Sequence, residues 1–383
     1  MNELLVEELF RDAVRSVDTL PPPLEAFRRR AAGELRRRRR RSVLGTTAAV
    51  GVLVLAVAGW LGTRPGGDAT VATPPVVTMV ENPANVAWWA EGQLHLANVA
   101  VAVPQAHHVV TDLVEINGGA VYGDDTGAVA FVGDDGEVTR IGTKAPGAPL
   151  VASDETGWVA WVDPRGRSPE LVVYDLTARE VLARRAVSDP DPDGGGAGVG
   201  SRPIALDGDQ VFYATPDGDR AWTVPDGGTE PVEPAGLLAV ASATRVWQLD
   251  PATIRIVQPF FSISFDRTGT GATISPDGNR VLTHTFGVRE GGSFGTVHLY
   301  DARSGESLWT GLARRDVPIA ATLGPENEVS YLVEPRAERP HHDDFVRQSS
   351  SSPYELRSCD QESRQCRSVT QLPRVETLPV LAR

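Results

Sequence analysis

From residue 76 onward the sequence predicts an all-β fold, and three observations carry this prediction. Short strand-like runs follow one another for about 300 residues without a helical pattern. Turn pairs such as Asp135-Gly136 and Asp277-Gly278 separate them. A strand-starting phrase recurs at intervals of roughly 30 to 50 residues, the range of propeller blades. The sequence therefore predicts a seven-bladed β-propeller, with six or eight blades as alternatives, behind an N-terminal transmembrane helix and a short helical cytoplasmic segment.

Residues 1–41 are predicted to form the cytoplasmic helical segment. Residues 3–17 place Val6, Phe10 and Val14 on one face of a helix, and Pro21 to Pro23 end it. This helix would either dock a cytoplasmic regulatory partner or lie on the inner leaflet of the membrane. The segment ends in six membrane-proximal basic residues, Arg36, Arg37, Arg38, Arg39, Arg40 and Arg41.

Residues 43–62 are predicted to be the transmembrane helix. The stretch from Val43 to Leu61 carries no charge and is about long enough to cross a ~30 Å hydrocarbon core. Arginines on one flank only place the N-terminus in the cytoplasm and the C-terminal domain outside the cell membrane. A cleaved export signal is the alternative, because residues 40–44 resemble the start of a twin-arginine signal and residues 56–58 a cleavage site. The long segment before the apolar stretch favours a retained, single-pass anchor.

Residues 63–75, rich in Gly, Pro, Ala and Thr, are predicted to be a linker to the extracytoplasmic domain at 76–383. Charge divides the chain in the same way. Residues 1–42 hold 11 arginines and 7 acidic residues, whereas the remainder holds 26 Lys and Arg against 43 Asp and Glu. The acidic remainder argues against nucleic acid as a partner and is typical of a soluble exterior.

The recurring starter phrases predict where each blade begins. The first blade begins at Val86, and the others begin at six starter phrases: VVTDL (109–113), PLVAS (149–153), PIALD (203–207), LLAVA (237–241), GATIS (271–275) and PIAAT (318–322). Residues 378–382 resemble a further starter with no strands after it, while the first blade has later strands but no clear starter. We therefore expect the C-terminal segment to supply the innermost strand of the first blade, with Val76–Val80 as the competitor.

One unit carries a resemblance to known proteins. SPDGNRV at 275–281 is similar to the repeat signature of TolB-like and WD-repeat-like propellers, and YDLTAREVL at 174–182 and YDARSGESL at 300–308 resemble the third-strand, turn, fourth-strand element of these repeats. The resemblance covers residues 76–383 and implies a propeller similar to those of actinobacterial membrane-anchored proteins. Members of this group bind proteins, peptides or sugars, or act as scaffolds, so the resemblance implies no single function.

No catalytic motif is present: the sequence holds no nucleophile elbow, zinc-binding helix or phosphate loop. Residues 189–194 alternate acids as in a calcium loop but lack the late glutamate. Weak candidates for metal binding are His341 to Asp344 and His107-His108. The segment from Ser153 to Trp158 is predicted to be a strand–turn–strand junction. The sequence thus predicts no enzyme, no metal and no cofactor.

Cys359 and Cys366 are predicted to form a disulfide across a β-hairpin, because facing strand positions lie at disulfide distance and the exterior is oxidising. The seven tryptophans after residue 63 are predicted mainly to pack between blades rather than to form a sugar platform: Trp88, Trp89, Trp158, Trp161, Trp222, Trp247 and Trp309.

The functional hypothesis is a non-enzymatic binding or sensing module with a protein, peptide or glycan ligand. The alternatives are an anti-sigma-like regulator of a cytoplasmic factor, a passive envelope scaffold, and a propeller hydrolase or lyase with its site in the central channel. Because strands alternate in direction, four long segments are expected at one end of the blades, opposite the linker: Pro164–Pro169, Ser188–Arg202, Gly287–Gly295 and Pro335–Pro353.

Overall fold

A computed structural model describes residues 76–103, 109–145, 148–165, 168–187, 200–225, 227–266, 269–289, 292–324, 328–335, 353–373 and 378–382. Contacts divide the chain into Met1–Leu53 and Val54–Arg383, and every described residue belongs to the second unit. In these described ranges no helix is long and apolar enough to cross a membrane. The predicted cytoplasmic segment, transmembrane helix and linker all lie outside them.

The described strands form seven antiparallel sheets. The blades contain, from the innermost strand outward, the following strands. Blade 1 has β28 (Val380–Leu381), β2 (Trp88–Ala90), β3 (Gln93–His95), β4 (Val99–Ala102) and β1 (Val77–Met79). Blade 2 has β5 (Val110–Ile116), β6 (Gly119–Asp124), β7 (Ala128–Gly133) and β8 (Val138–Thr143). Blade 3 has β9 (Val151–Ser153), β10 (Trp158–Asp163), β11 (Glu170–Asp175) and β12 (Glu180–Ala186).

The remaining blades follow the same order. Blade 4 has β13 (Arg202–Asp207), β14 (Gln210–Thr215), β15 (Gly218–Thr223) and β16 (Thr229–Pro231). Blade 5 has β17 (Leu237–Ala241), β18 (Thr244–Asp250), β19 (Thr253–Gln258) and β20 (Phe261–Asp266). Blade 6 has β21 (Gly271–Ile274), β22 (Arg280–Arg289) and β23 (Gly292–Asp301), with a single bridge from Tyr300 to Ser307 in place of a fourth strand. Blade 7 has β24 (Asp316–Leu323), β25 (Glu328–Pro335), β26 (Tyr354–Asp360) and β27 (Gln365–Leu372).

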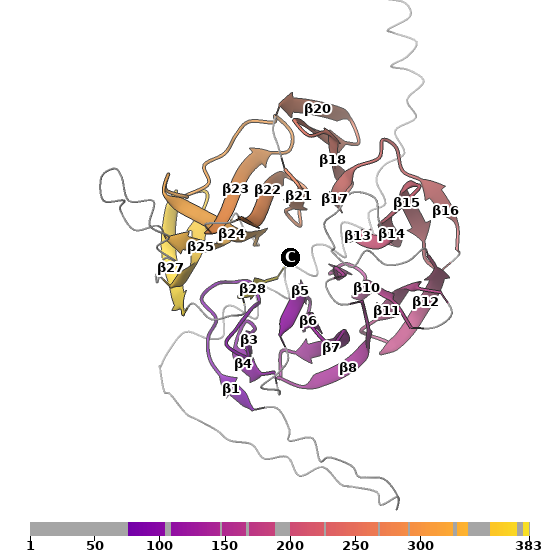
Figure 1. The fold of residues 1–383 in the computed structure, drawn as a ribbon, viewed down its shortest axis with the longest axis horizontal. Helices are drawn as coiled ribbons and strands as arrows, with labels where there is room; N and C mark the ends of the chain where they lie inside the picture. Colours follow the sequence, from indigo (N-terminus) through magenta and orange to yellow (C-terminus); the bar gives the residue numbers. More distant parts are fainter. Residues whose placement is uncertain are drawn as a thin grey trace, which may run out of the picture. The chain divides into compact units, whose positions relative to one another are not determined.

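The blades form a closed ring (Figure 1). The innermost strands of successive blades lie side by side in the order β28, β5, β9, β13, β17, β21, β24 and back to β28. Seven apolar clusters are buried, one between each pair of neighbouring blades, whereas an open row of seven blades would have only six such interfaces. Each cluster buries large side chains such as Trp161, worth about 2–3 kcal/mol apiece. The predicted seven-bladed propeller is confirmed.

The two ends of the propeller sequence close the ring. Val380 and Leu381 of β28 pair with Trp89 and Trp88 of β2, so the C-terminal segment is the innermost strand of blade 1, as predicted. The competing segment instead forms β1, which pairs with β4 as a fifth, outermost strand. The expectation that the chain enters the propeller at the blade end opposite the four long segments is therefore wrong, because β1 comes before β2 in the chain. Because β1 runs antiparallel to β4, it begins at the blade end that carries the blade-to-blade connections, not at the opposite end.

The expected loop at 287–295 is also wrong, because these residues continue a β-hairpin. Paired residues run along β22 and β23 as far as Arg289 opposite Gly292, which gives two ten-residue strands. We refer to residues 286–295 as the arm of blade 6. The alternating strand directions still place the arm at the same blade end as the other three predicted segments, whose middle parts lie outside the described residues.

The SPDGN signature forms the first turn of blade 6 through a local network. Asp277 accepts hydrogen bonds from the Ser275 hydroxyl at 2.6 Å and from the Asn279 backbone N–H at 3.0 Å. Gly278 has φ = 72°, a left-handed conformation that disfavours other residues. The turn also binds blade 5, since the carbonyl of Gly278 accepts hydrogen bonds from Thr244 and Gln258, each at 3.0 Å.

The turn between the third and fourth strands of a blade often contacts the outer part of the preceding blade. Gly136 of blade 2 packs on Val77, and Gly305 of blade 6 packs on Ile263. The carbonyl of Gly227 in blade 4 accepts a 2.7 Å hydrogen bond from Arg185 of blade 3. We call these contacts hooks, and they bind the blades together outside the apolar clusters.

Candidate binding surface at the junction of blades 6 and 7

The arm of blade 6 rests on the innermost strand of blade 7. A Cβ atom on Gly295 would overlap the carbonyl group of Pro318 in β24, so glycine is needed for the two backbones to approach this closely. At this point β24 has a bulge between Pro318 and Ala320. The arm is therefore held at its base against blade 7, at the end of the blades where the connections lie.

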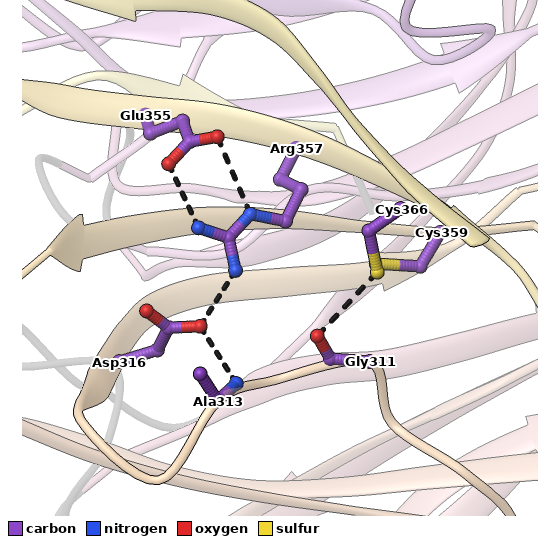
Figure 2. Close-up of a disulfide and its surroundings, with 7 residues drawn as sticks. All are labelled: Gly311, Ala313, Asp316, Glu355, Arg357, Cys359 and Cys366. Atoms are coloured by element: carbon purple, nitrogen blue, oxygen red, sulfur yellow. Dashed lines mark hydrogen bonds and ion pairs between the residues drawn. A yellow bond between two sulfur atoms is a disulfide. The ribbon is translucent and has the colours of Figure 1, made fainter. Parts of the chain in front are cut away.

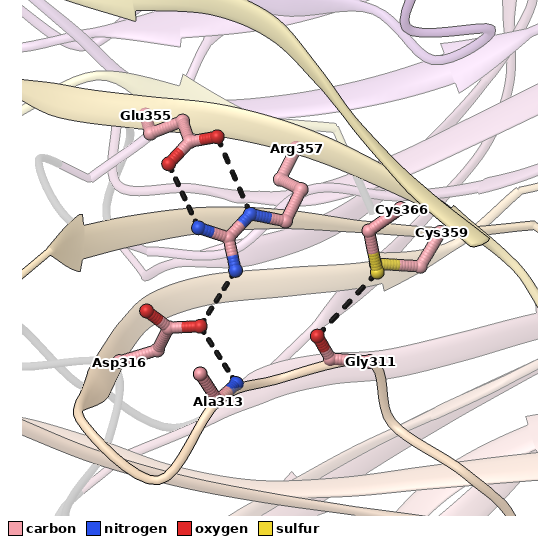
Figure 3. A network of polar contacts seen from close by, with 7 residues as sticks. All are labelled: Gly311, Ala313, Asp316, Glu355, Arg357, Cys359 and Cys366. Atoms are coloured by element: carbon pink, nitrogen blue, oxygen red, sulfur yellow. Dashed lines mark hydrogen bonds and ion pairs between the residues drawn. A yellow bond between two sulfur atoms is a disulfide. The ribbon is translucent and has the colours of Figure 1, made fainter. Parts of the chain in front are cut away.

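Arg357 of β26 ties blade 7 to the segment that arrives from blade 6 (Figure 3). Its guanidinium makes a 2.6 Å ion pair with Asp316 and a 2.8 Å ion pair with Glu355. Asp316 also accepts the backbone N–H of Ala313 at 2.8 Å. The Arg357 and Asp316 side chains are only 16% and 9% exposed, so the network is largely shielded from water. Fork-shaped guanidinium contacts of this kind fix geometry as well as charge.

Glu355 and Arg357 both keep their charge at neutral pH. The hydrogen bond from Arg357 lowers the pKa of the Glu355 carboxyl, which is the larger effect, against the opposing effect of burial. An ionised Glu355 and the permanently charged Arg357 therefore persist together. The network acts as a fixed strut rather than as a proton donor or acceptor.

The predicted disulfide lies beside this network (Figure 2). Cys359 and Cys366 occupy facing positions of β26 and β27 and are bonded at 2.06 Å. The disulfide packs on Gly311, where a Cβ atom would collide with both sulfurs, and the Gly311 carbonyl lies 3.4 Å from the Cys366 sulfur. The bond thus forms the hook by which blade 7 holds the outer part of blade 6.

The innermost strands bring no comparable ionisable group together in the described residues. Their acidic side chains accept backbone N–H groups of adjacent segments: Glu115 from Ala87, Asp207 from Ser242 and Asp112 from Leu150. Half-buried positions on these strands include Val151, Ile204, Leu238, Ala272, Ile319 and Val380. Lys144, the only lysine of the chain, is buried and donates to the carbonyl of Ala148 at 2.5 Å.

The other predicted site residues are placed as follows. Ser153 to Trp158 joins β9 to β10 through a turn, as predicted. Five of the seven tryptophans are buried between blades and Trp158 and Trp309 are half-buried, so core packing is confirmed for most of them. In the described residues no three metal-ligating side chains converge. Residues 189–194, His107-His108, 341–344 and Arg36 to Arg41 lie outside the described residues.

The Arg357 network was not predicted from the sequence. Its three charged members come from β24 and β26, and Asp316 and Arg357 are 41 residues apart. Only the pattern Glu355-x-Arg357, which places both side chains on one face of a strand, is a local signal. The contact of Gly311 with the disulfide could not be predicted either, because no residue near Gly311 in the sequence indicates it.

Comparisons with known proteins support no assignment beyond the fold. No family model matches the chain, and no curated protein sequence matches it. Among solved structures, Hsv2 from Kluyveromyces lactis has a TM-score of 0.41 and 10% identity, covering 70% of this chain and 99% of that one. TolB from Acinetobacter baumannii has a TM-score of 0.37 and 14% identity, covering 81% of this chain and 66% of that one. A chain of the mitotic checkpoint complex has a TM-score of 0.44 and 11% identity, covering 83% and 90%. At such identities these similarities concern the fold alone, and the seven-bladed ring rests on the sheet topology described above.

Proposed function

We propose that this chain is a single-pass membrane protein whose propeller lies outside the cytoplasm and acts as a non-enzymatic binding or sensing module. The observation that carries the binding role is the arm of blade 6, a paired hairpin that is held at its base by the close contact of Gly295 with Pro318 of β24. A preorganised projection of this kind loses little conformational entropy when a ligand binds. The ligand class is a protein, peptide or glycan.

The proposed location is supported by the uncharged stretch between Val43 and Leu61 and by the arginines on its N-terminal side only. A disulfide at Cys359 and Cys366 is in keeping with an oxidising compartment. A non-enzymatic role is supported by the apolar, half-buried positions of the innermost strands and by acidic groups that are occupied by backbone N–H donors.

Protease protection tests the location. Protease added to intact spheroplasts is expected to digest the region after Gly62 and to spare residues 1–41, detected by an N-terminal epitope. Permeabilised cells, in which both parts are digested, are the control. A mature protein that begins near Gly59 would instead establish signal cleavage and a released propeller.

Shortening the arm tests the binding role. Replacing residues 287–294 by Asn-Gly keeps Gly295 on Pro318 but removes the projection. We expect this variant to lose the ligands that the full chain binds on arrays of envelope peptides and glycans. The matched control exchanges only Glu290-Gly291 for Asn-Gly and should bind as the parent does. Unchanged binding by the shortened variant would locate the binding surface elsewhere.

A further inference from the structure

The fourth strand of blade 5, β20, differs from the fourth strands of blades 2, 3, 4 and 7, because its only charged residue, Asp266, is its last. β8, β12, β16 and β27 each carry charged residues, which is how natural sheets protect an exposed edge from pairing with another strand. The first five residues of β20, Phe261–Phe265, carry no charge. β1 is also uncharged, but it is only three residues long.

The hairpin that ends in β20 is also exposed at its tip. Gln258 pairs with Phe261 across a two-residue turn of Pro259 and Phe260, and the Phe260 side chain is 98% exposed. Gln258 holds this turn in place through its bonds to Thr244 and Gly278. Blades 2, 4, 6 and 7 use the corresponding turn as a hook, whereas Phe260 projects into solvent.

The register within the hairpin shows which backbone groups face outward. A two-residue turn makes Gln258 and Phe261 a hydrogen-bonded pair, and such pairs alternate along an antiparallel ladder. Phe261, Ile263 and Phe265 therefore direct their N–H and C=O groups to β19, and Ser262 and Ser264 direct theirs to the open edge. The free edge thus offers a donor and an acceptor at each of two serines.

The sequence of this edge is a palindrome, Phe261-Ser262-Ile263-Ser264-Phe265. We infer that β20 pairs with β20 of a second copy of this chain, antiparallel, about a two-fold axis at Ile263. In this register Ser262 faces Ser264 of the other copy. These two form a hydrogen-bonded pair, which uses the backbone N–H and C=O groups that both serines direct to the open edge. Ile263 faces Ile263 of the other copy. A two-fold interface requires such self-complementarity.

The charges along β20 and the size of the proposed interface are both consistent with pairing to a second copy of this chain. The register places Asp266, the only charged residue of β20, opposite Phe260 and far from the other Asp266, so no like charges face each other. A blade of this ring already accepts a fifth strand, since β1 pairs with the edge of β4. One six-residue strand pair is a small interface, well below the roughly 1,200 Å² of stable complexes, so the dimer should be concentration-dependent.

Cysteine crosslinking of the full chain in mild detergent tests the register. In Ile263→Cys the two introduced thiols should lie within disulfide distance, so mild copper-catalysed oxidation should give a covalent dimer on a non-reducing gel. The control is Val181→Cys on β12, which is also partly exposed at an outer strand. A dimer band of equal strength from both variants, or none from Ile263→Cys, would overturn the inference.

Charge exchange at the two serines gives a second test that leaves the hairpin intact, because both side chains are exposed. With Ser262→Lys and Ser264→Lys together, lysines face lysines, and the crosslinked fraction from Ile263→Cys should fall at least ten-fold. With Ser262→Lys and Ser264→Glu together, each lysine faces a glutamate, and the dimer should persist. The two charge variants are also compared by sedimentation without the Ile263→Cys substitution. A difference in dimer formation that persists there cannot be caused by the introduced cysteine. Equal association of the two charge variants would contradict the proposed register.

Discussion

At the scale of single residues, two half-buried groups set the response of this propeller to substitution and to pH. Arg357 neutralises Asp316 and Glu355 at the junction of blades 6 and 7. His95 of β3 stacks on Trp88 with ring centroids 3.7 Å apart. Arg357 is largely shielded from water and His95 is half-buried, so a change in the charge of either group alters the free energy of unfolding.

Replacing Arg357 by Met should destabilise the propeller by about 2 kcal/mol, because it leaves two poorly hydrated carboxylates without their cationic partner. Urea unfolding measures this change. The matched control is Arg367→Met: Arg367 is 54% exposed and lies 3.6 Å from Glu328, so its loss should cost less than about 1 kcal/mol. Equal losses from the two variants would show that the Arg357 network contributes no more than a surface pair.

Acidification should weaken the fold through His95. Burial lowers its pKa to about 4, from 6.5 in the unfolded chain. Between these values the unfolded state binds a proton that the folded state does not, so stability falls as the pH is lowered from 6.5 to 4. Because His95 is partly exposed, we expect a loss of about 1–2 kcal/mol. His95→Gln should lose less stability than the parent between pH 7 and 4.5, and identical losses would exclude His95 as the cause.

At the scale of elements, the sequence predicts what local patterns encode. Starter phrases mark the innermost strands because a buried strand needs a continuous apolar run, and the two cysteines lie on facing strands with a tight turn between them. The arm was expected to be a loop, because Gly287, Gly291, Gly292 and Gly295 are typical of turns. Its base contacts β24 of the next blade, and no local pattern in the sequence indicates that contact. The same holds for β1, whose three residues become a strand only because β4 offers an edge.

The closing strand gives a direct test at this scale. Deleting residues 375–383 removes β28, exposes the edge of β2 and opens the apolar cluster that contains Leu381 and Trp88. We expect the melting temperature to fall by about 10 °C or more, measured by circular dichroism. Removal of Arg383 alone is the control and should have no effect. An unchanged melting curve after the longer deletion would mean that the ring is stable without its innermost strand in blade 1.

At the scale of the whole molecule, charge restricts the possible partners. Residues 43–383 carry 26 Lys and Arg against 43 Asp and Glu, and the buried Lys144 is unavailable to a ligand. A surface of this sign repels the phosphate backbone of nucleic acids. A ligand of this acidic surface is therefore expected to carry basic groups of its own.

Electrophoretic mobility of duplex DNA checks this expectation. The full chain in mild detergent should retard DNA at low salt only through Arg36 to Arg41, and replacing these six arginines by glutamine should abolish the retardation. Replacing exposed Arg314 and Arg315 by glutamine is the control and should change nothing. Retardation that survives loss of the six arginines would show a basic surface on the propeller.

Closure by β28 also governs the order in which this protein can be made. Blade 1 receives its outer strands from the first part of the propeller sequence to emerge, but its innermost strand comes from the last residues of the chain. During synthesis, therefore, the inner edge of β2 stays open until β28 has been translated. A product that stops early in any blade has the same open edge, a feature that invites aggregation and removal. The ring can therefore close only in a chain that has been translated through β28.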